Sequence, residues 1–259
     1  MDEKKLPLTS HLQELRKRLI LSFIAIGVGF IICYTFADSI FNVLAAPLTD
    51  ILKAQGGTLI FISVAEAFFT YMKVAFIASV ILTSPFILYQ IWAFVAPGLY
   101  QKEKRYVVPF VLGGSLFFAL GVLFGYKVAI PVGFRFLLGY GTDIIKPMPS
   151  MKEYLSFSIK FLLAFGLVFE FPVVLVLLAK IGIIDAKMLA RQRKYAILLI
   201  FIVAAAVTPS PDLISQVIMA LPLMALYELS ILLSRIFGKR SAPILSEGDE
   251  NKGGPSAPA

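Results

Sequence analysis

Six long runs of apolar residues divide the chain, and polar or charged segments separate them. Runs of this kind are typical of helices that cross a membrane, because a helix of about 20 residues spans a hydrocarbon core of about 30 Å. We predict transmembrane helices at residues 19–36, 74–94, 106–130, 154–179, 195–207 and 213–233. The fifth run would reach only about 20 Å. We therefore expect the bilayer to be thinner near it, or a partner to shield it.

The composition excludes a soluble enzyme. Hydrophobic residues make up 59% of the chain and charged residues 15%, with a mean hydropathy of +0.86. Soluble domains contain about 45–50% apolar and about 25% charged residues. One Cys and one His leave no internal disulfide and no zinc site, and no nucleotide-binding P-loop motif occurs. We expect no cofactor, no metal and no ATP use, so that any work draws on a gradient or a partner.

The net charge of +8 is explained by topology and does not indicate a nucleic-acid partner. Of the 24 Lys and Arg residues, 17 lie in the segments that face one side of the predicted membrane and five in those that face the other. Basic residues are retained on the cytoplasmic side. We therefore predict that both termini are cytoplasmic. Lys73 and Lys160 are assigned to the ends of spans.

The segments outside the spans differ in character. The apolar loop 37–67 predicts interfacial helices or a cap on the non-cytoplasmic side. Residues 238–259, rich in Gly, Pro, Ser and acids, predict a disordered cytoplasmic tail. The membrane domain is thus predicted at residues 1–237. Gly121 and Gly125 lie four positions apart in the third span, a pattern typical of close helix packing.

A few acidic residues stand out against the basic cytoplasmic face. Glu14 precedes Arg18 by four residues, which fits either a local ion pair or a carboxylate presented to a basic ligand. Glu103 is the only acid among three bases, and by itself fits a solvated loop charge. Asp212 precedes the sixth span, where it could cap a helix.

Glu170 differs because it lies deep within the fourth span. An ionised acid there costs roughly 2.5–3.5 kcal/mol, so we expect it to be protonated, hydrogen-bonded or facing water. Pro172 lacks an N–H, which predicts a kink near Glu170. Glu170 could donate to a freed carbonyl or meet Gln216 of the sixth span. A structural role and a ligand, proton or partner site remain open.

Five motifs occur in a fixed order: His11-Leu12-x-Glu14-Leu15-Arg16-x-Arg18-Leu19, Ala46-Pro47-Leu48, Pro85 through Tyr100 with Glu103, Phe165-Gly166-Leu167-Val168-Phe169-Glu170-Phe171-Pro172, and Thr208-Pro209-x-Pro211-Asp212 with Gln216 and Pro222. Together they resemble the TatC family of the bacterial twin-arginine protein translocase. The resemblance covers residues 8–237. It implies an all-α integral membrane protein with six spans, both termini cytoplasmic, in a concave, glove-like bundle.

The resemblance also implies a function. Such a protein is the core receptor that recognises twin-arginine signal peptides of folded cargo. With the single-span subunits TatA and TatB it exports the cargo across the bacterial inner membrane, driven by the proton-motive force, as a homo-oligomer within the complex and not as an enzyme. The resemblance assigns signal-peptide binding to Glu14, Glu103, Arg16 and Phe94. It assigns an intramembrane polar or partner site to Glu170 and Gln216. Pro47 and Asp212 are assigned to structural or external loop positions.

One alternative from another class stays open at this point. A proton-coupled small-solute transporter could use Glu170 as its proton carrier.

Overall fold

A computed structural model describes residues 8–54, 57–95, 107–139, 148–207 and 213–238. Nearly all of these residues are helical, which confirms the predicted all-α fold, and within the described ranges one isolated parallel bridge joins Ile60 to Ser150. The elements in chain order are α1 (Leu8–Thr35), α2 (Ala37–Ala54), α3 (Val64–Val95), α4 (Val107–Phe124), the π-helix η3 (Gly125–Ala129), α5 (Ile130–Leu138), α6 (Met151–Phe169), α7 (Phe171–Lys180), α8 (Ala186–Arg191), α9 (Arg193–Val207) and α10 (Leu213–Phe237).

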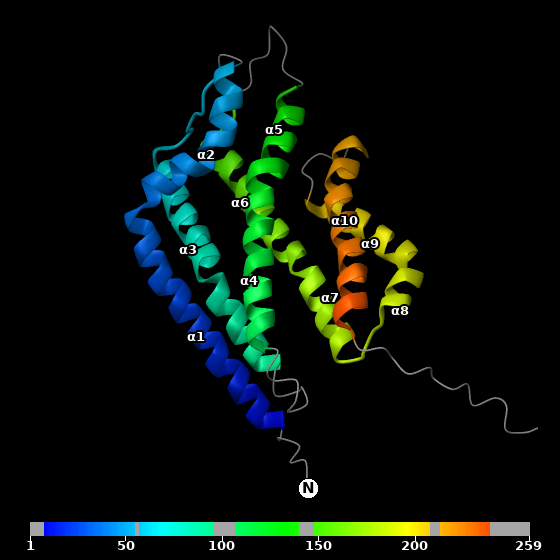
Figure 1. Cartoon of the computed structure of the whole chain (residues 1–259). Helices are drawn as coiled ribbons and strands as arrows, with labels where there is room; N and C mark the ends of the chain where they lie inside the picture. The colour runs from blue at the N-terminus through cyan, green and yellow to red at the C-terminus, as the bar shows by residue number, and fades with distance from the viewer. Residues whose placement is uncertain (1–7, 55–56, 96–106, 140–147, 208–212, 239–259) are drawn as a thin grey trace, which may run out of the picture.

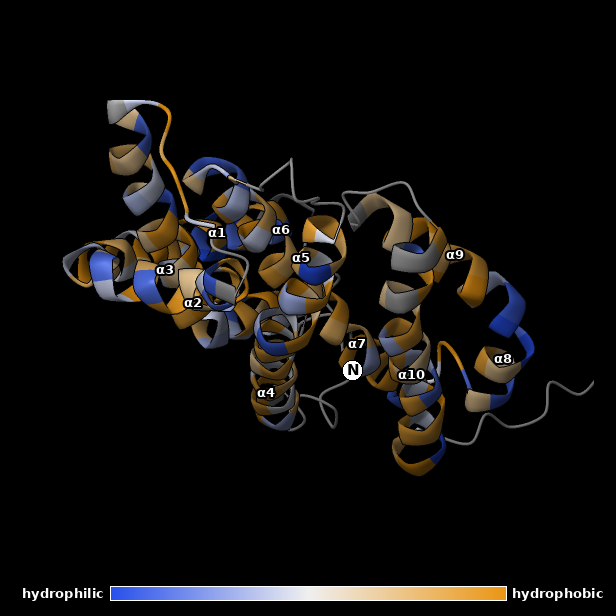
Figure 2. Ribbon diagram, turned by 90° about the horizontal axis from the view of Figure 1, so that it is seen from above, coloured by the Kyte–Doolittle hydropathy of each residue, from blue (hydrophilic) through white to orange (hydrophobic). Residues whose placement is uncertain are grey.

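Figure 1 shows α1 and α3 at one side of the bundle, α4 in the middle, and α7 to α10 at the other side. The view from above gives the same order, with apolar positions along most of each ribbon (Figure 2). Many of the outward-facing side chains are large and apolar, for example Phe23, Leu112 and Leu167. Such a surface suits lipid and not water.

Five helical stretches in the described residues are long and apolar enough to cross a membrane: His11–Thr35, Ala65–Phe94, Val108–Leu138, Met151–Lys180 and Met219–Phe237. They coincide with the first four and the sixth of the predicted spans. The fifth corresponds to α9, whose 15 residues reach about 22 Å. The total of six spans therefore stays a prediction. The start of α1 and the end of α10 lie at the same end of the bundle, as an even number of passes requires (Figure 1).

Two helices are longer than the hydropathy predicted. Helix α3 begins at Val64, ten residues before the predicted start, because its first turns carry polar side chains that lower the hydropathy without breaking the helix. Helix α4 continues through η3 and α5 to Leu138. Lys73 and Lys160 lie nine residues after the starts of α3 and α6, and their assignment to span ends stays a prediction.

The fourth span bends where the sequence predicted a bend. Helix α6 ends at Phe169 and α7 starts at Phe171, with Pro172 in its first turn. At the break the N–H of Glu170 donates to the Leu167 carbonyl at 3.1 Å, one residue short of the usual helical partner. The bend sets the direction of α7, which packs against α10.

The close-packing pattern in the third span is confirmed. A Cβ atom on Gly121 would overlap the Phe165 carbonyl oxygen of α6 and lie 2.8 Å from the Cβ of Phe169. On Gly125 it would meet Phe161 and Phe165 at ordinary contact distance. Only a glycine at position 121 lets α4 approach α6 this closely.

Candidate functional site

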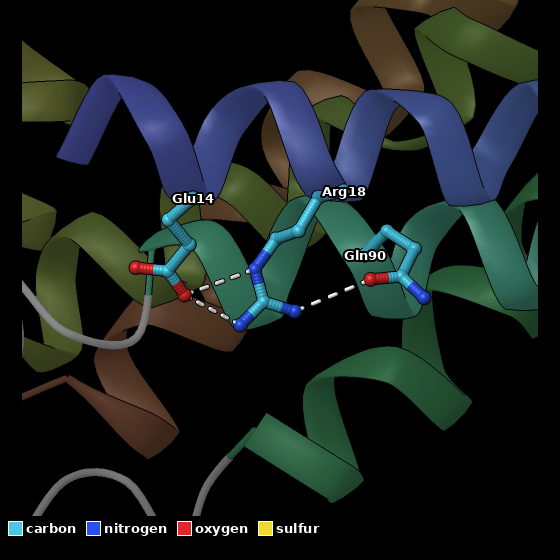
Figure 3. A network of polar contacts seen from close by, with 3 residues as sticks. All are labelled: Glu14, Arg18 and Gln90. Carbon is cyan, nitrogen blue, oxygen red and sulfur yellow. Dashed lines mark hydrogen bonds and ion pairs between the residues drawn. The ribbon is translucent and has the colours of Figure 1, made fainter. Parts of the chain in front are cut away.

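The first polar cluster lies where α1 crosses the last turns of α3. Arg18 donates from Nη2 and Nε to Glu14 Oε1, at 2.6 and 3.1 Å. Its Nη1 donates to the Oε1 of Gln90 on α3 at 3.2 Å (Figure 3). The side chains of Arg18 and Glu14 are 24% and 28% exposed, whereas Gln90 is buried. The local ion pair that the spacing predicted is therefore present, and a buried amide anchors it to a second helix.

The same contact continues one turn toward the start of α1. The His11 ring stacks on Phe94, with centroids 4.3 Å apart and planes 18° from parallel. His11, Glu14 and Arg18 recur every three to four residues, so they form one polar stripe that faces α3. The leucines of the same segment are exposed instead. In lipid this is the expected arrangement, because polar groups gather toward protein.

The structure shows less about Arg16 and Glu103, the other residues assigned to signal-peptide binding. Arg16 is exposed and makes no ion pair within the described residues. Arg18, and not Arg16, is the arginine that pairs with Glu14. Glu103 lies outside the described residues. The end of α3 and the start of α4, which flank its segment, lie at the same end of the bundle as the start of α1 (Figure 1).

The second polar position is Glu170 at the junction of α6 and α7. It is 9% exposed, and its Oε1 has no hydrogen-bond partner among the described residues. A Cβ atom on Gly114 of α4 would lie 3.0 Å from Oε2, so the carboxyl group lies directly over that glycine. A buried carboxyl oxygen without a donor costs free energy and is rare in folded proteins.

Gln216 does not supply the missing hydrogen-bond donor for Oε1 of Glu170. Its Nε2 donates to the Phe201 carbonyl of α9 at 2.9 Å, and Oε1 of Glu170 has no partner among the described residues, so this one of the two possible contacts of Glu170 is not formed. The reason lies in the depth of each residue, because Gln216 is in the first turn of α10 whereas Glu170 is far along the fourth span. Gln216 instead ties α10 to the short helix α9.

At the opposite end of the bundle, α2 forms the cap that loop 37–67 predicted. Pro47 lies within α2, so of the two roles predicted for it, structural or external loop, its position fits the structural one. A helical proline removes the N–H that would bond to residue i−4, here Val43, and strains the turn before it. Tyr126 of η3 donates to the Val43 carbonyl at 2.7 Å, and Tyr154 of α6 donates to the Leu44 carbonyl at 2.6 Å. The proline thus frees the Val43 carbonyl for Tyr126, and the neighbouring Leu44 carbonyl gives a second bond through which another helix holds the cap. Asp212 lies outside the described residues.

Glu66 connects the start of α3 to α6 at the same end of the bundle. Its Oε2 accepts from the amides of Ile62 and Ser63, at 2.8 and 3.4 Å, and its Oε1 accepts from the Lys152 amide of α6 at 2.9 Å. The sequence Ser63-Val64-Ala65-Glu66 is a capping box, in which the third helical residue bonds back to the residue before the helix. This signal would have located the start of α3, and our sequence analysis missed it.

Gln90 and His11 are the other contributors that the sequence analysis did not assign. A buried amide within a predicted span was the available signal for Gln90. Within the described residues, no group of three or more His, Cys, Asp or Glu side chains could hold a metal ion. The polar chemistry present is carboxylate, guanidinium and amide. It can bind cationic or hydrogen-bonding groups at the start of α1.

Comparisons with known proteins agree with this geometry. The family model described as Sec-independent protein translocase protein (TatC) matches residues 10–222. The chain is 50% identical to the Sec-independent protein translocase protein TatC of Desulforapulum autotrophicum over 250 residues, covering 96% of this chain and 92% of the relative. It is 43% identical to the protein of the same name from Aquifex aeolicus over 242 residues, which cover 92% of this chain and 99% of that relative. A crystal structure of the twin arginine translocase receptor TatC superposes with a TM-score of 0.75 at 44% identity, covering 87% of this chain and 98% of that one.

Proposed function

Since the chain belongs to the TatC family of Sec-independent protein translocases, and is thus a receptor component of the twin-arginine system, we propose that Glu14 and Glu103 bind the two consecutive arginines of a signal peptide. Arg16 and Phe94 would border the same site. The observation that carries the proposal is the partly exposed Glu14 carboxylate, held by Arg18 through a single oxygen. The comparisons favour this function over the small-solute transporter.

The geometry around Glu14 suits a second guanidinium group. Both bonds from Arg18 end on Oε1, and Oε2 makes no hydrogen bond with a described residue. A guanidinium group matches the plane and spacing of a carboxylate, whereas an ammonium group acts as a point charge. Arg18 also fixes the rotamer of Glu14 before a peptide arrives, because Gln90 holds its far side. This arrangement favours arginine over lysine.

The strength of such a site is limited. Two charge-assisted contacts contribute about 1.5–3 kcal/mol each, which corresponds to dissociation constants from about millimolar to tens of micromolar. The arginine pair therefore specifies the signal without holding it tightly. Burial of the apolar part of the signal against the helices supplies the rest.

The test is a binding titration with a synthetic signal peptide and the purified full chain. We expect Glu14→Gln or Glu103→Gln to weaken binding of the Arg-Arg peptide about 10- to 150-fold, the loss of one such contact. A Lys-Lys peptide should bind weakly to wild type and lose little further. The matched control is Glu228→Gln, which removes the carboxylate of the exposed Arg193–Glu228 pair. Wild-type affinity for the Arg-Arg peptide in both test variants would refute the site.

The finer parts of the function are proposals as well. Together with TatA and TatB the receptor exports folded cargo across the bacterial inner membrane, driven by the proton-motive force, with several copies of this chain in the complex. Glu170 supports a docking site within the membrane, since its buried Oε1 lacks a donor among the described residues. The short α9, tied to Gln216, would continue that face.

Substitutions at Glu170 test whether this residue docks a partner helix or only packs within the bundle. If a partner helix donates to this carboxyl group, Glu170→Leu should lose TatA and TatB on co-purification, whereas Glu170→Gln, which keeps an acceptor oxygen, should retain most of them. Affinity for the signal peptide should not change in either variant. Full co-purification with Glu170→Leu would leave only a structural role.

A further inference from the structure

A cavity of about 710 Å³ opens between α1, α3 and α6. Its walls are apolar and aromatic, with Phe23 and Phe30 from α1 and Phe69 and Phe76 from α3. Two cations also line it, Lys73 and Lys160, both exposed and without an ion-pair partner among the described residues. Two unpaired cations on an apolar wall call for a ligand that is acidic at one end and apolar at the other.

The depth of the two lysines identifies where that acidic group lies. Helix α3 has 32 residues and a length of about 48 Å, so it extends about 9 Å beyond each side of a 30 Å hydrocarbon core. Lys73 is nine residues from the start of α3, about 13 Å along the axis, and Lys160 is at the same distance from the start of α6. Both lysines therefore branch from the helices a few ångströms below the headgroup layer and reach it by extending along the helix.

We propose that this cavity binds an anionic phospholipid from the leaflet on the side of α2, which is the outer leaflet in the orientation predicted here. The phosphodiester lies between Lys73 and Lys160, and an acyl chain packs along the phenylalanines. Gly27 leaves room for that chain, because a Cβ atom at this position would meet nothing within 4 Å. Hydrogen bonds from two ammonium groups suit a phosphate at this level better than a carboxylate buried at mid-membrane.

The first test measures lipid binding by native mass spectrometry of the delipidated full chain with phosphatidylglycerol or phosphatidylcholine. Wild type should prefer phosphatidylglycerol. We expect Lys73→Gln with Lys160→Gln to weaken phosphatidylglycerol binding about twenty-five-fold, about fivefold for each lysine, with phosphatidylcholine binding unchanged. The matched control is Lys53→Gln with Lys152→Gln, which removes two exposed charges at the same end of the bundle. An equal loss in the control pair, or an unchanged preference in the test pair, would overturn the proposal.

The second test fills the cavity without changing any charge. Gly27→Leu should fit without a clash and should block the acyl chain, so that binding of phosphatidylglycerol falls although both lysines remain. Gly113→Leu is the control, since this glycine also has open space around its Cβ position but lies on α4, outside the cavity. Unchanged lipid binding in Gly27→Leu would overturn the acyl-chain assignment. If the lysine pair held the acid of a partner helix instead, the double variant would lose that partner and keep its lipid preference, which also overturns the proposal.

Discussion

The two ends of the bundle are held together by different chemistry. At the end with α2, which we call the cap end, hydrogen bonds from Glu66, Tyr126 and Tyr154 connect α2, α3, η3 and α6 through backbone groups. At the end where α1 starts, which we call the N-terminal end, side chains bond to one another, with Glu14, Arg18 and Gln90 in one chain. Backbone groups cannot change partners without unfolding a helix, whereas side chains can. The comparison supports a fixed scaffold at one end and the proposed binding site, with exchangeable side-chain bonds, at the other.

At the cap end, the first backbone amides of α6 also have hydrogen-bond acceptors. The first amides of a helix have no partner within it. Here the Met151 amide donates to the Ile60 carbonyl at 2.8 Å, the Lys152 amide to Glu66 at 2.9 Å, and the Glu153 amide to the Ser150 hydroxyl at 3.2 Å. Two of these three partners come from the segment around the start of α3, so the starts of α3 and α6 form one unit.

The largest effect should follow from breaking the Glu66 connection. Glu66→Gln replaces a carboxylate that accepts from three amides by a group with one acceptor oxygen, so backbone donors of both helices lose their partners. We expect the midpoint of thermal unfolding in detergent to fall further than in any other variant described below, while affinity for the signal peptide stays the same. Glu153→Gln, an exposed acid in the first turn of α6, is the control. A wild-type midpoint would contradict the scaffold role.

The two tyrosines of the cap end should rank below Glu66 and differ from each other. Tyr154→Phe leaves the Leu44 carbonyl without its donor in a buried setting and should cost about 1–3 kcal/mol of unfolding free energy. Tyr126→Phe acts on a more exposed bond and should cost about 0.5–1.5 kcal/mol. Tyr34→Phe, on the exposed face of α1, should change nothing. Equal costs for all three would show that these hydroxyl groups do not hold the cap.

The smallest effect on stability, and a specific one on binding, should come from Arg18. Arg18→Gln removes a partly exposed i, i+4 pair worth about 0.3–0.5 kcal/mol, so unfolding should barely change. Because Arg18 holds Glu14 in position for the peptide, affinity for the arginine pair should fall about tenfold. An affinity that stays level or rises by up to about twofold would instead mean that Arg18 only neutralises Glu14. Arg193→Gln at the Arg193–Glu228 pair controls for loss of a surface charge.

Much of the fold was predictable from the sequence, because a bilayer imposes strict rules on length and polarity. The apolar runs located the long helices, and Pro172 located the bend at Glu170. The start of α3 was missed, because hydropathy does not register a capping box such as Ser63 with Glu66. The contact that Glu170 could have made with Gln216 is not formed, because Gln216 lies in the first turn of α10 and bonds to the Phe201 carbonyl of α9.

The sequence by itself determined which long apolar segments suit a membrane and that Gly121 and Gly125 mark a close-packed face, since the length, polarity and spacing of residues along one helix carry both. Only the tertiary structure decided which helices are neighbours. It brings Gln90 to Arg18 across 72 residues, and Lys73 and Lys160 to one cavity. Lipid satisfies an apolar helix face as well as another helix does, so hydrophobicity alone cannot select the partner of a span. Hydrogen bonds, aromatic contacts and close approach at small residues make that selection, and they exist only once the helices have met.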